Sequence, residues 1–282
     1  MPSERTLKNR ILAFISEQRP PVVIMGYPIA LAGATLALGN LPTPLEMLQI
    51  FVAVYFIVSS MHIINGVIDF ERDKKKWPMR PLATGLVERH EFVIYGILMG
   101  AIGTFLAYYW FNWQCALIVA FVVITGMLYI NYLRDKIGFL PLMWILALMP
   151  IGAWVAFAPQ TVFTPLPWLL YLFLAVHQIG HMVSEELHDP ETKGFIIEPG
   201  LQKRPMLYVL SILLMLVVGV VIYLSTALHW IYLMALFALT AFSLISAVPM
   251  VKEPTSTENF RKANMVIVNY NIVYWLALGV IL

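Results

Sequence analysis

The sequence predicts an all-α membrane protein in which nine transmembrane helices form a bundle around a central cavity. Three observations predict this fold: an apolar composition, nine long apolar stretches, and basic residues confined to alternate connections. Of the 282 residues, 60% are hydrophobic and 12% are charged, and the mean hydropathy is +0.80. Soluble domains are about 45–50% apolar and about 25% charged. We therefore expect lipid to be the main solvent of this chain.

A helix needs about 20 mostly apolar residues to cross a hydrocarbon core roughly 30 Å thick. The stretches that meet this requirement are 22–38, 45–65, 92–110, 113–132, 139–157, 166–184, 206–224, 228–251 and 264–282. The preceding residues 1–20 have basic side chains but no continuous apolar core, so we expect an amphipathic helix on the membrane surface that is not cleaved off. Nothing separates a second domain, and we expect residues 1–282 to form a single one.

The charge distribution predicts the orientation, because short cytoplasmic connections are enriched in Lys and Arg. All 18 basic residues lie before the first predicted span or in the connections after the second, fourth, sixth and eighth spans. The other connections contain none and read LGNLPTPLE, FNW, APQTVFTPLP and STALHW. This pattern predicts a cytoplasmic N-terminus and an external C-terminus. The long connections 66–89 and 185–204 are then cytoplasmic, and we expect them to be the active-site loops.

The composition argues against nucleic-acid binding and against sites built from cysteines. The net charge is only +2 and the basic residues are scattered, which argues against nucleic-acid binding. The single cysteine, Cys115, leaves no intramolecular disulfide and no cysteine-based metal site.

Three oxygen-bearing side chains share one helix face at the end of the second predicted span. Asn65, Asp69 and Asp73 are spaced i, i+4 and i+8. Carboxylates near a membrane helix end repel one another and are costly to desolvate, so a cation is expected. Oxygen ligands suit Mg²⁺, which shares its coordination with substrate phosphates. The alternative is a set of solvated charges at the membrane surface, an interpretation we favour only for the lysine run 74–76.

This segment resembles the first signature of the UbiA superfamily of intramembrane prenyltransferases. The signature has an Asn, acids four and eight residues later, an Arg-Pro pair and a Gly. The matching residues here are Asn65, Asp69, Asp73, Arg80, Pro81 and Gly85. The family usually has Asp directly after the Asn, where this chain has Gly66. A carboxylate that would support the metal ligands is therefore missing at that position.

A second cluster ends the sixth predicted span, where polar residues again repeat every four positions and share a helix face. The resemblance implies that an acid-rich segment here closes the site around a second Mg²⁺ ion. Glu185 and Asp189 are the residues that we expect to hold it, with Glu186 and Glu191 as reserves. The match is looser than the first, because Glu replaces the usual Asp.

The same helix face carries His177 and His181, a spacing that also allows a transition-metal pair. Membrane hydroxylases use several such pairs, whereas this chain has 6 histidines and one pair. We therefore favour a polar helix face near the cavity.

Further side chains are expected at the diphosphate. Tyr132 and Lys136 resemble a Tyr-x-x-x-Lys element of the family, although Tyr and Lys are common at membrane interfaces in any case. Arg19, before Pro20, resembles the basic residue that opens the family's first span. The full set expected to bind diphosphate is Asn65, Arg72, Arg80, Tyr132, Lys136 and Lys193.

The resemblance implies a Mg²⁺-dependent prenyltransferase, in which two ions neutralise the leaving diphosphate of a prenyl diphosphate. Its lipophilic acceptor would be an electron-rich group such as a phenol, a quinone precursor or a tetrapyrrole carboxylate. Rings such as Tyr129, Trp144 and Trp154 are candidates to stabilise the carbocation, although most membrane aromatics serve packing. A membrane terpene cyclase remains an alternative, as Gly66 and the looser second cluster depart from the usual pattern. A transporter is a remote alternative, because its site would lie near the midplane.

Overall fold

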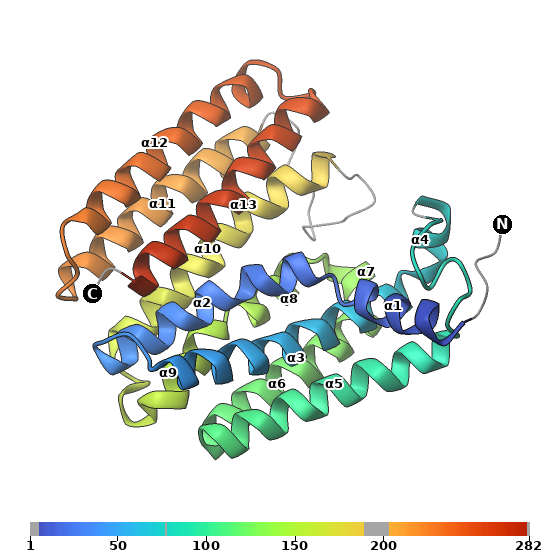
Figure 1. Cartoon of the computed structure of the whole chain (residues 1–282). Coiled ribbons are helices and arrows are strands. Elements are labelled where there is room, and N and C mark those ends of the chain that lie inside the picture. The colour runs from blue at the N-terminus through green and yellow to red at the C-terminus, as the bar shows by residue number, and fades with distance from the viewer. Residues whose placement is uncertain (1–5, 77, 189–202, 281–282) are drawn as a thin grey trace. The chain divides into compact units, whose positions relative to one another are not determined.

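The structure is a computed structural model that describes residues 6–76, 78–188 and 203–280; for residues 21–23, 72, 76, 135 and 186–188 it describes the backbone alone. Within these ranges every regular element is a helix (Figure 1). The helices are α1 (Leu7–Glu17), α2 (Pro20–Leu38), α3 (Pro44–Ile68), α4 (Phe70–Lys76), α5 (Arg89–Trp110), α6 (Trp113–Tyr132), α7 (Arg134–Ile137), α8 (Leu140–Leu146), α9 (Met149–Phe157), the 3₁₀ turn η1 (Pro159–Thr161), α10 (Pro165–His188), α11 (Arg204–Leu224), α12 (Ile231–Lys252) and α13 (Thr257–Val280).

The chain divides into two compact units. Unit 1 comprises Met1–Tyr27 and Thr43–Asn131, and unit 2 comprises Pro28–Pro42 and Tyr132–Leu282. The prediction of a single domain is not tested by this division.

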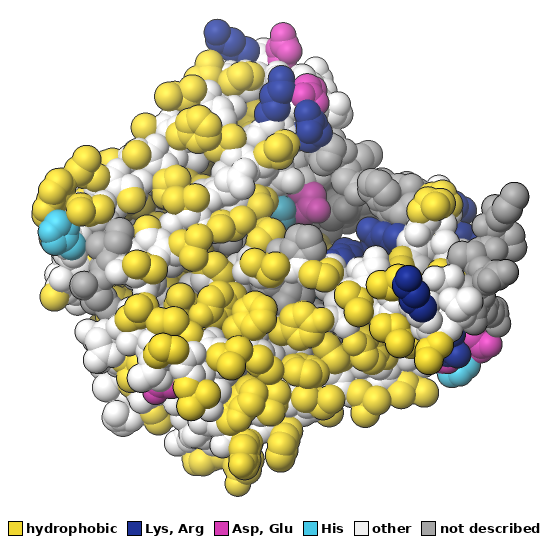
Figure 2. Space-filling view, in the orientation of Figure 1, with side chains coloured by type: hydrophobic (Ala, Val, Ile, Leu, Met, Phe, Trp, Pro, Cys, Tyr) yellow, Lys and Arg dark blue, Asp and Glu magenta, His cyan; other side chains and the backbone are white. Residues whose placement is uncertain are grey.

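Eight helical segments in the described part of the chain are long and apolar enough to cross a membrane. They are α3, α5, α6, α8 with α9, α10, α11, α12 and α13. Large apolar side chains are exposed along them, and Figure 2 shows hydrophobic side chains over much of the visible helical surface. Such a surface is stable in lipid and not in water. The predicted multi-pass membrane protein is confirmed. The first predicted span, 22–38, is not among the eight, because it falls on α2, whose apolar part Ile24–Leu38 is shorter.

The fifth predicted span, 139–157, is interrupted in the middle. Helix α8 ends at Leu146 and α9 begins at Met149, with Pro150 in its first turn. Proline has no N–H to donate to the carbonyl four residues earlier, and its ring clashes there. That earlier residue is Leu146, the last of α8. The backbone of Pro150 also packs closely on α2, because a Cβ added at Gly33 would lie 2.5 Å from the Pro150 carbonyl oxygen.

Unit 1 is built on the packing of α3 against α5. Glycines on α5 allow the close approach: a Cβ at Gly96 would lie 2.8 Å from Ile64 Cδ1, and one at Gly100 2.8 Å from Ser60 Oγ. Small residues drive helix association in membranes by letting backbones approach. The Ser60 hydroxyl also donates to the Gly96 carbonyl at 2.7 Å. This contact fixes the end of α3, where the first acid cluster lies.

Helix α1 is held in unit 1 by its C-terminal half. Phe14 packs on Phe92 and Tyr95, with ring centroids 5.0 and 4.8 Å apart. Its other face exposes Leu7, Ile11 and further apolar side chains. A helix with an exposed apolar face is consistent with the predicted position on the membrane surface, which stays a prediction.

Unit 2 has an aromatic core. Phe173 of α10 stacks on Tyr274 of α13 with ring centroids 3.8 Å apart. The Tyr274 hydroxyl lies 2.7 Å from that of Tyr232 on α12, and the Trp275 N–H donates to Asn271 at 2.7 Å. Since these polar atoms are paired inside the helix packing, α10, α12 and α13 are held in a defined register. The end of α10, which carries the second cluster, is positioned by this core.

Candidate functional site

The first cluster, Asn65, Asp69 and Asp73, keeps its predicted common helix face across a helix boundary. Helix α3 ends at Ile68 and α4 begins at Phe70, with Asp69 between them. The Asp69 N–H donates to the Asn65 carbonyl at 2.9 Å, and the Asp73 N–H donates to the Asp69 carbonyl at 2.8 Å. These two bonds have the i to i−4 spacing of an α-helix. They keep Asn65, Asp69 and Asp73 in helical succession, as the sequence predicts.

Both aspartates are buried. Asp69 and Asp73 are each 4% exposed, in a part of the molecule where most charged residues are at the surface. Asp73 forms an ion pair with Arg80 from the segment after α4. Burying a carboxylate is costly unless it meets cations or hydrogen-bond donors. The structure therefore brings together Asp69, Asp73 and Arg80, three of the residues that the sequence singled out.

The segment that returns Arg80 to the aspartates depends on Gly85. This residue has φ = +69°, a left-handed conformation that side chains other than glycine adopt only with strain. The Gly85 N–H donates to the Leu82 carbonyl at 3.3 Å, which closes the turn. The glycine of the predicted signature is thus required by backbone geometry.

Arg19 joins the same cluster from the junction of α1 and α2. It is the one described residue other than glycine with a positive φ, +52°, and it directly precedes Pro20. Burial, followed by the nearby Arg80 guanidinium, lowers the pKa of Arg19, while Glu17, Asp73 and Asp69 oppose the shift. Two guanidinium groups close enough to repel each other form a natural receptor for an anion with several charges.

Sequence reasoning missed Glu17, the last residue of α1. It is 3% exposed, and burial raises the pKa of its carboxyl against the effect of Arg19 and Arg80. Its Oε1 lies 2.5 Å from the place where a Cβ at Gly66 would be. Residues 7–17 include both basic and acidic side chains, and no sequence pattern there indicated that Glu17 is buried. The one available signal was that Gly66 stands where the family signature usually has an acid, which left room for a carboxylate from elsewhere.

The donor set suits Mg²⁺ better than a transition metal. Among the described residues, no three His, Cys, Asp or Glu side chains are close enough to hold a metal by themselves. Mg²⁺ needs only one or two carboxylates, because waters and substrate phosphates complete its octahedron. A buried Glu17 oxygen without a hydrogen-bond partner among the described residues is a further place for a hydrated cation. The residues of unit 1 therefore fit the predicted ion.

The second cluster is less buried. The Glu185 side chain is 34% exposed, and its Oε2 lies 3.3 Å from His181 Nε2. His181 Nδ1 lies 2.8 Å from Asn264 Oδ1, which also accepts from Ser184 at 3.1 Å. Other predicted residues cannot be placed: Asp189, Glu191 and Lys193 lie outside the described residues, and only the backbone is described for Arg72 and Glu186.

The histidine pair has structural partners. His177 is 3% exposed and its Nε2 lies 3.1 Å from the Ile267 carbonyl oxygen of α13. The His177 and His181 rings are parallel, with centroids 6.2 Å apart. Both rings thus connect α10 to α13, which favours the polar helix face over a metal pair.

Tyr132 and Lys136 do not share a continuous helix. Helix α6 ends at Tyr132, α7 begins at Arg134, and both side chains are exposed. Their role at the diphosphate stays a prediction. Of the aromatic candidates, Tyr129 is buried, the Trp144 N–H donates to the Ala175 carbonyl at 3.2 Å and the Trp154 N–H donates to Thr161 at 3.0 Å. Such partners are typical of packing residues.

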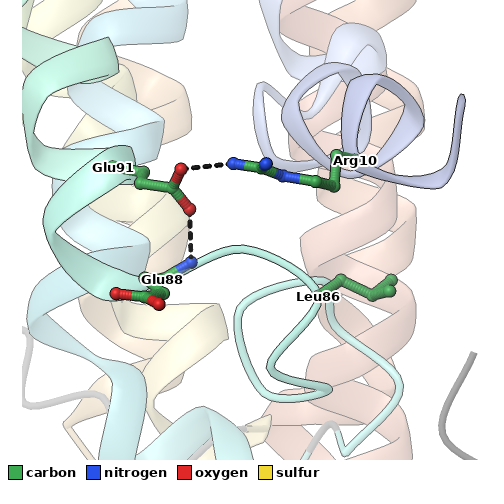
Figure 3. A pocket seen from close by; sticks show the side chains of 4 residues that line it. All are labelled: Arg10, Leu86, Glu88 and Glu91. Carbon is green, nitrogen blue, oxygen red and sulfur yellow. Dashed lines mark hydrogen bonds and ion pairs between the residues drawn. The ribbon is translucent and has the colours of Figure 1, made fainter. Parts of the chain in front are cut away.

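A small polar depression lies between α1 and the start of α5 (Figure 3). It is lined by Arg10, Leu86, Glu88 and Glu91. Arg10 forms an ion pair with Glu91, whose other oxygen accepts from the Glu88 N–H at 2.9 Å. The charges that line the depression are thus used to fasten α1 to α5.

Comparisons with known proteins point to one fold and one family. A digeranylgeranylglyceryl phosphate synthase from Pyrococcus furiosus is 31% identical over 170 residues, which are 60% of this chain and 55% of the relative. The chain thus matches about half the length of that curated relative. An apo UbiA homologue from Aeropyrum pernix K1 superposes with a TM-score of 0.69, 18% identity and coverage of 90% of this chain and 97% of the other.

A UbiA homologue from Archaeoglobus fulgidus, bound to DMAPP and Mg²⁺, gives a TM-score of 0.63 at 15% identity and covers 94% of this chain and 99% of that one. These structural likenesses show a common fold. The model of the UbiA prenyltransferase family matches residues 27–272. With most of its length matched and the signature acids in place, the chain belongs to the UbiA prenyltransferase family.

Proposed function

We propose that this protein is a Mg²⁺-dependent intramembrane prenyltransferase. The observation that carries the proposal is the buried pair Asp69 and Asp73, with Arg80 on Asp73, at the end of an apolar helix. Ionisable side chains within or at the end of a membrane helix are rare and costly, and they usually mark a functional site. A prenyl diphosphate matches the surroundings, because its head is strongly anionic and its tail is apolar.

Five polar side chains of unit 1 have a part in this reaction. Asn65, Asp69 and Asp73 hold the metal, while Arg80 and Arg19 bind the diphosphate oxygens by charge-assisted hydrogen bonds. When bound, Mg²⁺ supplies the Lewis-acid neutralisation that makes diphosphate a good leaving group. The apolar helices around the prenyl chain exclude water from the allylic cation.

The second cluster has the same role for a second ion. We assign Glu185 and Asp189 as its ligands and Arg72, Tyr132, Lys136 and Lys193 as further contacts of the diphosphate. The support for these assignments is the family signature. The positive charges of the connections likewise support a site that opens to the cytoplasm.

The relatives suggest both substrates. The name of the Pyrococcus furiosus relative describes a glyceryl phosphate with two geranylgeranyl groups. We therefore infer a geranylgeranyl diphosphate as donor and a hydroxyl group of a prenylglyceryl phosphate lipid as acceptor. The allylic carbon–oxygen bond breaks with its electron pair going to diphosphate. The acceptor oxygen then bonds to the allylic carbon, and the hydroxyl proton passes to water.

Mass spectrometry of the products tests this proposal. Purified protein in lipid nanodiscs is given Mg²⁺ and geranylgeranyl diphosphate, with and without geranylgeranylglyceryl phosphate. We expect a doubly prenylated lipid with the acceptor and only hydrolysis without it. A cyclised hydrocarbon or alcohol in the sample without acceptor would instead indicate a terpene cyclase, for which the Gly66 departure is the supporting observation. Uptake into vesicles without diphosphate release would indicate a transporter.

A further inference from the structure

The position where this chain departs from its family signature is occupied by a side chain from another helix. Gly66 directly follows Asn65, where the signature usually has an acid. A Cβ at Gly66 would lie 2.5 Å from Glu17 Oε1 and 3.4 Å from its Cδ. The carboxyl group of Glu17 thus fills the space beside α3 that an acid at position 66 would enter. A side chain at position 66 would displace the end of the Glu17 side chain from this place.

The Glu17 carboxyl is also incompletely satisfied. The Leu82 backbone forms a hydrogen bond to it, yet Oε2 is buried and has no partner among the described residues. An unpartnered carboxylate oxygen in a buried, membrane-adjacent site is strongly unfavourable. Its presence indicates a polar group or cation that completes the site when the protein binds its ligands.

Glu17 is held firmly in this place. Its neighbour Gln18 is 2% exposed, accepts a hydrogen bond from the Tyr55 hydroxyl of α3 and donates one to the Tyr95 hydroxyl of α5. These contacts anchor the end of α1 to both helices that carry the site. The charges of Arg19, Arg80 and Asp73 all act on the Glu17 carboxyl. It therefore belongs to the same cluster as the signature residues.

We propose that Glu17 supplies from α1 the carboxylate that the signature lacks at Gly66, and that its free oxygen holds the water shell of the Mg²⁺ ion bound by Asp69 and Asp73. The proposal rests on the proposed function and deepens it, because it names a positioning residue for that metal. Bound Mg²⁺ keeps several waters, and groups that hold such waters and ligands tune metal affinity. In this proposal the carboxylate comes from α1 and occupies the space beside α3 that an acid at position 66 would enter.

The first test is the isosteric change Glu17→Gln. Mn²⁺ is titrated into the solubilised protein and the free ion is followed by electron paramagnetic resonance. We expect the Mn²⁺ dissociation constant, and the Mg²⁺ concentration for half-maximal turnover, to rise about 10- to 100-fold. The melting temperature without metal should not fall, because a neutral amide is less costly to bury than an unpartnered carboxylate.

The second test relocates the carboxylate. Glu17→Ala removes it, and the double variant Glu17→Ala with Gly66→Asp returns it from α3. We expect the double variant to recover most of the metal affinity, whereas Gly66→Asn in the same background does not. Gly66→Asp alone should bind metal poorly, since the new side chain meets the Glu17 carboxyl.

Glu91→Gln is the matched control for the docking of α1. Glu91 of α5 forms an ion pair with Arg10, which lies on α1 like Glu17. The variant therefore weakens the docking of α1 without touching Glu17 or Gly66, and it should leave metal affinity unchanged. A wild-type affinity in Glu17→Gln, or a relocated acid that restores no more than the amide control, would overturn the inference while the prenyltransferase stands. Wild-type protein that binds no Mn²⁺ and releases no diphosphate would overturn both.

Discussion

The two acid clusters of this protein differ in how their charge is surrounded. Asp69 and Asp73 of unit 1 are 4% exposed and lie among arginines. Glu185 of unit 2 is 34% exposed and contacts a histidine. A carboxylate interacts more strongly with a nearby ion when water is excluded. The comparison suggests that the first cluster provides most of the metal affinity and that the second one contributes less per residue.

The largest expected effect comes from Asp73→Asn. The change removes a proposed metal ligand and breaks the ion pair of Asp73 with Arg80. Turnover with geranylgeranyl diphosphate at saturating Mg²⁺ should fall by more than about 100-fold, since even residues that only support metal ligands are worth about 10- to 100-fold. Glu71→Gln on the same helix is the control, because Glu71 is exposed. Equal losses in both variants would show that α4 acts through its net charge and not through a metal site.

Arg80→Ala should have the next largest effect. Hydrogen bonds to charged groups contribute about 1.5–3 kcal/mol, so the KM for the prenyl diphosphate should rise about tenfold or more. Steady-state kinetics would measure it, with Arg89→Ala as an exposed basic control from the same connection. A lower kcat at unchanged KM would argue that Arg80 only neutralises Asp73.

Glu185→Gln tests the comparison directly. Because its side chain is partly solvated, we expect turnover to fall about tenfold, at the lower end of the range for residues around a metal. Glu258→Gln is a matched control in unit 2, where an exposed Glu258 pairs with Arg261 at 2.8 Å. If Glu185→Gln abolished turnover as fully as Asp73→Asn, the two clusters would be equivalent and the comparison would be wrong.

The smallest effect is expected from Gly85→Ala. A side chain at φ = +69° costs about 1–2 kcal/mol, and no atom lies within 4 Å to add a clash. Gly39 is a matched control, with φ = +71° and equally open surroundings. Both variants should lose a few degrees of thermal stability. Only Gly85→Ala should also raise the KM for prenyl diphosphate, because its turn positions Arg80; a KM change in both would contradict this.

Much of the helical fold and of the first cluster could be predicted from the sequence, because both follow from local periodicity. Hydropathy and helical spacing are properties of neighbouring residues, and they predicted the long helices and the stripe from Asn65 to Asp73. The interruption at Pro150 was missed because the apolar run continues through it. The early start of α13 at Thr257 was missed because its first turns are polar.

Glu17 could not be predicted in the same way. Its burial depends on Gly66, which is far away in sequence. It also depends on two hydrogen bonds of its neighbour Gln18, which accepts from the Tyr55 hydroxyl and donates to the Tyr95 hydroxyl. No local pattern encodes such a contact. The missing acid at Gly66 indicated only that the site differs from the usual pattern, whereas the tertiary packing shows what replaces it.

Diphosphate release by the purified protein in nanodiscs is the most direct test of a metal-dependent site. With geranylgeranyl diphosphate and the acceptor lipid present, we expect release in Mg²⁺, complete loss in excess EDTA and recovery when Mg²⁺ is restored. Asp69→Ala should release nothing under any of these conditions. Undiminished release in EDTA, or wild-type release by Asp69→Ala, would contradict the proposed role of the buried carboxylates.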